Sequence, residues 1–334
     1  MRRVLVPPHV PDIAPFSPRR VPVVSLAGNT MGTTWSVKFA AHSGVTERDL
    51  LHVIEARLGL VVAQMSQWDP ESDLSRFNRA QPGSLQILPQ AFFGVLRAAL
   101  DLARETGGAY DPALGALIEL WGFGAAGRRM DIPAQTEIER ARASAGWSRL
   151  FVDDERRAVR QPGGVHLDLS SIAKGFAVDL VSGMLTQRGI ADHLVEIGGE
   201  LRGSGTKPDQ SPWWVALDGV QGASGETIVA LHGLSVATSG DAQRFIAVNG
   251  RKFSHTIDPR TGWPIPDNLA SVTVLDRSCM RADALATALS VLGAERGYAF
   301  ASARDIAARF LLRGPGGIRE RTTPAFAAMA DGPA

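Results

Sequence analysis

The feature that most constrains the fold is a run of short strand-like segments between residues 193 and 275, separated by Gly, Asp and Asn turns. The Asn249-Gly250 pair within this run is a strong signal for a two-residue hairpin of type I′. The predicted strands lie at 193–197, 213–217, 227–231, 235–238, 243–248, 251–256 and 270–275. Such a run predicts mixed or antiparallel sheets.

Helical patterns flank these strands. Thr46 is placed to cap a helix that runs to about Met65, with Asp49 three residues after the cap. Further helices are predicted at about 89–105, 113–121, 136–145, 172–187 and 281–292, and further strands at 30–40 and 307–313. No Pro/Ser linker and no internal repeat interrupts residues 25–325, so the sequence predicts one α+β domain with flanking helices.

The two ends of the chain lack this patterning. We expect a disordered Pro-rich tail over residues 1–22, the folded domain over 23–325, and a disordered C-terminal tail over 326–334. The N-terminal arginines resemble the start of an export signal, but the apolar run stops at Pro7-Pro8. A wrongly assigned start codon is the alternative explanation. No stretch is long and apolar enough to predict a membrane span.

Composition excludes some classes of protein. The formal net charge of the 334 residues is +1, which provides no basic field for nucleic acid or an anionic membrane. Cys279 is the sole cysteine, so neither an intrachain disulfide nor a cysteine-rich metal site is possible.

The helical segment RADALATALSVLG carries Asp283 and Thr287, which are four residues apart and share one helix face. A carboxylate and a hydroxyl are hard oxygen ligands suited to Mg²⁺, which takes phosphate oxygens as further ligands. The structural alternative is that Asp283 only complements the helix dipole and Thr287 only packs.

The segment DLSSIAKGFAVD leads from Asp168 through two serines into a helix that bears Lys174. Free N–H groups at a helix start, together with a lysine, favour an anion. An ordinary serine-capped helix with a solvated lysine is the alternative. Neither GxGxxG nor GxxxxGK[ST] occurs, so the usual dinucleotide and P-loop fingerprints are absent.

The segment SHTIDPRTG, residues 254–262, combines a histidine with a charged turn. His255 beside Asp258 and Arg260 could serve as a general base, although a lone histidine is more often a structural residue. Met31 and Trp68 offer apolar and aromatic surfaces suited to a flat ring, with core packing as the alternative.

Taken together, these segments resemble the ApbE family of FAD:protein FMN transferases. The resemblance rests on the order and spacing of SDLSRFN (72–78), GAYDPALGALIELWGFG (108–124), DLSSIAKGFAVD (168–179), ATSGD (237–241), SHTIDPRTG (254–262) and ADALATAL (282–289). It implies a T-fold-like α+β domain that binds FAD with Mg²⁺. It further implies transfer of FMN through its phosphate to a Ser or Thr hydroxyl of an acceptor flavoprotein, with release of AMP.

The resemblance also implies roles for individual positions. Asp283, Thr287 and an oxygen of Ser171 correspond to the Mg²⁺ site, and His255 to the suspected base, oriented by Asp258 or Asp241. The positions that correspond to the FAD site are Met31, Trp68, Ala109, Tyr110, Asp111, Asp168, Lys174 and Ile257, the last through its backbone.

The chain departs from the family pattern in places. Glu200 follows Gly198-Gly199 where a shorter acid or an amide is common, and Ala242 stands where an aromatic often follows the TSGD aspartate. Many relatives carry an N-terminal lipidation cysteine, which this sequence lacks. With no apolar signal core either, we expect a cytoplasmic protein.

Two other functions use the same residues. A Mg²⁺-dependent FAD pyrophosphatase would replace the acceptor hydroxyl by water and release FMN and AMP. A non-catalytic flavin-binding protein would not need Asp283, Thr287 and His255 together, which disfavours it. Neither the acceptor nor the balance between transfer and hydrolysis follows from the sequence.

Overall fold

The computed structural model describes residues 2–7, 21–41, 44–217, 219–220, 225–241, 245–248 and 250–330. Its helices are α1 (Glu47–Met65), α2 (Asp73–Arg79), α3 (Gln90–Glu105), α4 (Gly115–Leu120), α5 (Gln135–Ser144), α6 (Ala173–Gln187), α7 (Cys279–Ser302) and α8 (Pro324–Ala328). The strands of its main sheet are β2 (Val23–Thr30), β3 (Thr33–Ala40), β7 (His193–Ile197), β8 (Glu200–Ser204), β11 (Leu234–Gly240), β14 (Leu269–Asp276), β15 (Ala307–Gly314) and β16 (Gly317–Thr322). Smaller sheets are formed by β1 (Arg2–Leu5), β9 (Trp213–Ala216) and β10 (Glu226–Leu231), by β12 (Phe245–Val248) and β13 (Arg251–Ser254), and by β4 (Leu85–Ile87), β5 (Phe151–Asp153) and β6 (Ala158–Arg160).

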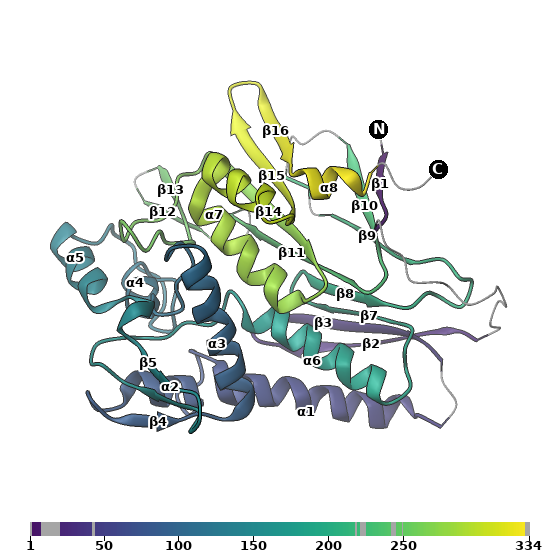
Figure 1. Cartoon of the computed structure of the whole chain (residues 1–334), viewed down its shortest axis with the longest axis horizontal. Helices are drawn as coiled ribbons and strands as arrows, with labels where there is room; N and C mark the ends of the chain where they lie inside the picture. Colours follow the sequence, from purple (N-terminus) through teal and green to yellow (C-terminus); the bar gives the residue numbers. More distant parts are fainter. Residues whose placement is uncertain are drawn as a thin grey trace.

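The main sheet is antiparallel throughout and is covered by helices (Figure 1). Within the described residues it has eight strands in the order β16-β15-β14-β11-β8-β7-β3-β2. The β1-β10-β9 sheet is mixed, because β1 pairs parallel with β10 and β9 pairs antiparallel. The predicted α+β class with mixed and antiparallel sheets in a single domain is confirmed.

The central strands of the main sheet are buried on both faces. In β7, Val195 and Ile197 belong to the large core under α1, α3, α6 and α7, while Leu194, the residue before Val195, packs on a second core. β14 divides its side chains in the same way, with Val274 in the first core and Leu275 in the second. This follows from the two-residue period of a strand, which sends neighbouring side chains to opposite faces.

Most predicted elements are present with boundaries within a few residues. Thr46 caps α1 as expected, and its Oγ1 accepts a hydrogen bond from the Asp49 N–H at 3.1 Å. Strands β12 and β13 pair antiparallel, with Val248 opposite Arg251. Asn249 itself lies outside the described residues. The sequence analysis did not predict β1, β2, β4, β8, β16 or the short helices α2 and α8.

Helix α7 is broken at Gly293, directly after the helix predicted over residues 281–292. Gly293 has φ 77° and ψ 177°, which is non-helical backbone inside the helical run from Cys279 to Ser302. A residue with a side chain rarely adopts such a positive φ, so glycine is required there. The segment before the break carries Asp283 and Thr287, and the segment after it was not predicted.

The N-terminal tail predicted over residues 1–22 is wrong for its first part. Residues Arg2–Leu5 form β1, whose Leu5 is fully buried in the second core. Arg3 donates two hydrogen bonds to Glu320, at 2.8 and 2.7 Å, and its guanidinium lies over the ring of Phe326. Residues 8–20 lie outside the described part of the chain.

The predicted C-terminal boundary at residue 325 is also wrong. α8 extends past it, and Phe326 is fully buried beside Met329 in the second core. Thr323 caps this helix by accepting from the Phe326 N–H, and the Met329 carbonyl accepts from the Val6 N–H at 2.9 Å. β1 and α8 therefore close the second core together (Figure 1). Among the described residues, no helix combines the length and apolar character needed to cross a bilayer.

Candidate active site

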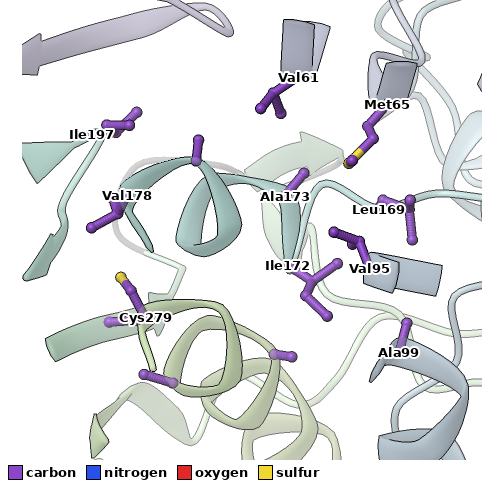
Figure 2. Packing of buried hydrophobic residues seen from close by; sticks show 14 of the residues in the cluster. Val61, Met65, Val95, Ala99, Leu169, Ile172, Ala173, Val178, Ile197 and Cys279 are labelled. Carbon is purple, nitrogen blue, oxygen red and sulfur yellow. The ribbon is translucent and has the colours of Figure 1, made fainter. Parts of the chain in front are cut away.

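The start of α6 is set in the large core. Leu169, Ile172 and Ala173 are buried there, between Met65 of α1 and Val95 of α3 (Figure 2). Because apolar side chains fix the backbone on both sides of Ser170-Ser171, the loop that enters the helix has a defined conformation. The polar groups that this loop carries are consequently positioned by packing.

Asp168 and Ser171 anchor this loop. The Asp168 side chain is 4% exposed, and its Oδ1 accepts from the N–H and the hydroxyl of Ser170, at 2.8 and 2.6 Å. The Ser171 hydroxyl donates to the hydroxyl oxygen of Tyr110 at 3.1 Å. The structure thus brings together residues from two of the predicted FAD and metal segments, 109–111 and 168–174.

The Ala109–Asp111 segment is itself buried. Burial raises the pKa of Tyr110 well above its usual range, so its hydroxyl remains neutral. The Asp111 carboxylate accepts from the Ala113 N–H at 2.8 Å and from the Trp147 N–H at 3.1 Å. Burial raises the pKa of Asp111 to about 6, although these two backbone bonds lower it. Asp111 therefore stabilises the local backbone, and Ala109 is 2% exposed beside it.

A buried charge cluster forms where α6 meets β8 and α7. Lys174 forms an ion pair with Glu200, which is 3% exposed, and Asp283, 6% exposed, accepts from the Gly175 N–H at 3.0 Å. Burial lowers the pKa of Lys174, but the carboxylates of Asp283 and Glu200 raise it above its usual value overall. Burial and the charge of Asp283 raise the pKa of Glu200 to about 8. Burial also raises the pKa of Asp283, against the lowering effect of Lys174.

The composition of this cluster suits a cation. One ammonium group faces two carboxyl groups, so a proton or a cation from solution is needed to balance the second carboxyl. Glu200 Oε2 is buried and has no hydrogen-bond partner among the described residues. Thr287, partly exposed, follows Asp283 by one helical turn. A carboxylate with hydroxyl oxygens is a donor set that fits Mg²⁺, which keeps several waters and takes phosphate oxygens. No cluster of three or more His, Cys, Asp or Glu side chains suited to a metal occurs in the described residues.

The turn at 254–262 docks on the other end of the same helix segment. The Asp258 carboxylate accepts from the N–H, Nε and Nη2 of Arg260, at 2.9, 2.8 and 2.7 Å, so it is engaged by that arginine. Arg260 Nη2 also donates to the Val291 carbonyl of α7 at 3.0 Å. The Trp121 indole N–H donates to the Gly262 carbonyl at 2.9 Å and holds the end of the turn on α4.

His255 and Ile257 lie at the beginning of this turn. The His255 ring is partly exposed and meets the Phe123 ring nearly edge-on, with centroids 6.2 Å apart. Ile257 is 3% exposed and belongs to a third core that joins α4, α5 and the β12–β13 hairpin. Asp241, the other candidate to orient His255, is 3% exposed and accepts from Arg313.

Met31 and Trp68 differ in exposure. Met31 occupies the β2–β3 turn with φ 49°, a left-handed conformation, and packs partly on the large core. A shallow depression is lined by residues 29–34 around it. Trp68 is 49% exposed in the loop between α1 and α2.

Helix α7 connects these groups. Asp283, Thr287 and Val291 lie at intervals of four residues along one face, a span of about 12 Å. We call Lys174, Glu200, Asp283 and Thr287 the helix-crossing half of the site, and residues 254–262 the turn half. The sequence analysis noted Glu200 only as an unusual residue and missed its ion pair with Lys174, since no local signal links β8 to α6.

Comparison with known proteins relates the sequence and the fold of this chain to one family. The profile of the ApbE family matches residues 31–310. The chain is 38% identical over 306 residues to an FAD:protein FMN transferase of Vibrio cholerae serotype O1, covering 91% of each chain. It is 32% identical to the FAD:protein FMN transferase of Escherichia coli K12, covering 82% of this chain and 80% of the other. The crystal structure of the apo form of the Pseudomonas stutzeri flavinyl transferase ApbE superposes with a TM-score of 0.87 at 39% identity, covering 94% and 98% of the two chains. The structure of the Vibrio cholerae flavin transferase ApbE superposes with a TM-score of 0.86 at 36% identity, covering 92% of this chain and 99% of the other.

Proposed function

Since the chain belongs to the ApbE family, we propose that it is a Mg²⁺-dependent FAD:protein FMN transferase. Its substrates are FAD and an acceptor flavoprotein with a reactive Ser or Thr hydroxyl. The acceptor oxygen forms a bond to the FMN phosphorus, the bond from that phosphorus to the AMP oxygen breaks, and the hydroxyl proton passes to a base. Most of the catalysis is positioning, because phosphoryl transfer requires little covalent chemistry from the protein.

The observation that carries the proposal is the arrangement along α7. Asp283 and Thr287 lie on one helix segment, and the same segment receives Arg260 of the turn that bears His255. A pyrophosphate placed along this face would lie beside the proposed metal ligands and near the turn that carries His255.

Individual residues have distinct tasks in this scheme. Asp283, Thr287 and an oxygen of Ser171 would hold Mg²⁺, which when bound neutralises charge on the phosphates. Lys174 supplies a positive charge near the same phosphates, and His255 accepts the proton of the acceptor hydroxyl. Tyr110 and Asp168 hold the loop at the start of α6, through Ser171 and Ser170 respectively.

The test is incubation of the full-length protein with FAD, Mg²⁺ and a candidate acceptor, followed by intact mass spectrometry of the acceptor. We expect one FMN on the acceptor and one AMP released for each FMN transferred. An acceptor with its target hydroxyl removed, and a reaction with EDTA, are the controls. FMN and AMP without an adduct would instead identify a pyrophosphatase, and FAD binding without turnover would identify a binding protein.

A further inference from the structure

Asp179, on α6, is a partly buried anchor for the start of α7, with its side chain 21% exposed. Its carboxylate accepts from the N–H groups of Cys279 and Met280, both at 3.0 Å, and from the Ser278 hydroxyl at 2.8 Å. Arg202 of β8 donates a fourth bond at 2.7 Å. The first N–H groups of a helix have no partner within the helix, and a negative charge there is stabilised by the helix dipole. Ser278 caps α7 locally by accepting from the Arg281 N–H at 3.3 Å, and Asp179 adds from another helix acceptors for the Cys279 and Met280 N–H groups.

A second contact joins the same two helices one turn away. The Gly175 N–H donates to Asp283 Oδ2 at 3.0 Å, and a Cβ at Gly175 would lie 2.4 Å from the Cys279 carbonyl oxygen. Only glycine permits so close an approach. Gly175 and Asp179 are four residues apart on α6, as Cys279 and Asp283 are on α7. The crossing is thus fixed at two points, each a pair of residues on facing helices.

The position of Asp283 depends on both points. Figure 2 shows Cys279 and Val178 at this crossing, packed in the large core. The Asp179 anchor fixes the axial position of α7, and Asp283 projects one turn beyond it. Mg²⁺ accepts little deviation from octahedral geometry, so a small shift of the helix lowers its affinity.

From these contacts we propose that Asp179 is a positioning residue for the metal site, acting through α7 and touching neither metal nor substrate. The proposal depends on the proposed function only in taking Asp283 as a ligand of the divalent cation. The Asp179 carboxylate fixes the position of the helix from which Asp283 and Thr287 reach that cation.

The test is a titration of the full-length protein with Mn²⁺ in the absence of FAD and acceptor. Binding is measured as the loss of the EPR signal of the free ion. Mn²⁺ takes the same oxygen ligands as Mg²⁺. Asp179→Asn keeps the shape but cannot accept all four hydrogen bonds, and we expect about 10-fold weaker Mn²⁺ binding, the size of other outer-shell effects. In the transfer assay, the Mg²⁺ concentration for half-maximal rate should rise while kcat at saturating Mg²⁺ changes less.

Val178→Ala is the matched control. Val178 is a fully buried neighbour on the same helix, and its truncation loosens the core without removing a hydrogen bond from the start of α7. We expect Val178→Ala to lower the Tm at least as much as Asp179→Asn while leaving Mn²⁺ affinity within about 2-fold, because it removes no outer-shell partner. Equal losses of Mn²⁺ affinity in the two variants, or native affinity in Asp179→Asn, would overturn the proposal. A wild-type protein that binds Mn²⁺ but transfers no FMN would refute the proposed function and leave this comparison intact.

Discussion

The helix-crossing half and the turn half of the site hold their charges in opposite ways. In the helix-crossing half, Glu200 and Asp283 are 3% and 6% exposed and are held by α6, a helix distant from both in sequence. In the turn half, Asp258 pairs with Arg260 two residues away, and the two side chains are 16% and 36% exposed. The first arrangement requires the whole fold, whereas the second forms within one turn.

This difference indicates that the two halves of the site have different roles. A buried site is already organised before a ligand arrives, so it suits metal ligands, whose geometry must be accurate. A turn that is partly solvated can adjust, which suits a base that must meet an acceptor protein. We therefore expect large losses from changes in the helix-crossing half and, apart from His255, small ones from changes in the turn half.

The largest effect is expected for Asp283→Ala. The only carboxylate among the proposed metal ligands is lost, so FMN transfer should fall by about 10³-fold or more. Steady-state rates at several Mg²⁺ concentrations measure this, with circular dichroism to verify the fold. Thr287→Val is the graded control, because a hydroxyl contributes less to a Mg²⁺ site than a carboxylate does. Normal transfer by Asp283→Ala in Mg²⁺ buffer would remove this residue from the metal site.

His255→Gln tests the one residue of the turn half for which we expect a large effect, the proposed base. Removal of a general base typically lowers the rate by about 10²–10⁴-fold, while FAD affinity should change little. Single-turnover transfer and an FAD titration separate the two quantities. Gln can also donate a hydrogen bond, so a near-native rate in this variant would show that His255 only holds a phosphate or the turn.

The stability of the fold around the helix-crossing half should also depend on pH. The residue responsible is His193, which lies under α6. His193 is fully buried, its Nδ1 is 2.8 Å from the Ile190 carbonyl, and its Nε2 is 2.7 Å from the Ser182 hydroxyl. Burial lowers the pKa of His193 to about 4. Below pH 6.5 the unfolded chain gains a proton there that the folded protein does not bind. The free energy of unfolding should therefore fall from pH 6.5 to pH 4, by up to about 3 kcal/mol.

Urea unfolding of the wild type and of His193→Gln across this pH range isolates the effect. Asp111 titrates in the same range in both proteins, so its contribution cancels in the difference. The stability advantage of the wild type should shrink as the pH falls. Parallel pH profiles for the two proteins would show that His193 is not buried in the neutral form.

The smallest effect is expected for Asp258→Asn. The ion pair with Arg260 is partly exposed, and such pairs contribute about 0.2–1 kcal/mol, so the transfer rate should fall by less than about 5-fold. Arg260→Gln, which removes the other member of the pair, should give a loss of similar size. A loss of about 10²-fold in Asp258→Asn alone would restore Asp258 as the group that orients His255.

The sequence predicts those parts of the site that depend on local geometry. Asp283 and Thr287 share a helix face because of their four-residue spacing. Gly293 interrupts that helix because a residue without a side chain can adopt the positive φ found there. The Lys174–Glu200 pair and the anchor at Asp179 depend on how α6 crosses β8 and α7, which local spacing does not encode. The assignments of individual residues to FAD and Mg²⁺ stay predictions.

The ends of the chain were mispredicted for a related reason. Residues Arg2–Leu5 are too few, and too close to Pro7-Pro8, to indicate a strand by their own pattern. They become one because β10 offers a free edge and the second core accepts Leu5. The same holds for Phe326, whose burial depends on that core.

The pairing of β1 with β10 has a consequence for biosynthesis. Arg2–Leu5 leave the ribosome before their partners Glu226–Val229, which are roughly 220 residues further along the chain. At typical elongation rates β1 waits about 10–45 s for its partner to be made. During this interval the segment that carries the core residue Leu5 has no strand to pair with, so its backbone can bind chaperones or other nascent chains. Slower translation between β1 and β10 would lengthen this exposure, so codon choice in the intervening stretch should influence how much of the protein reaches the folded state.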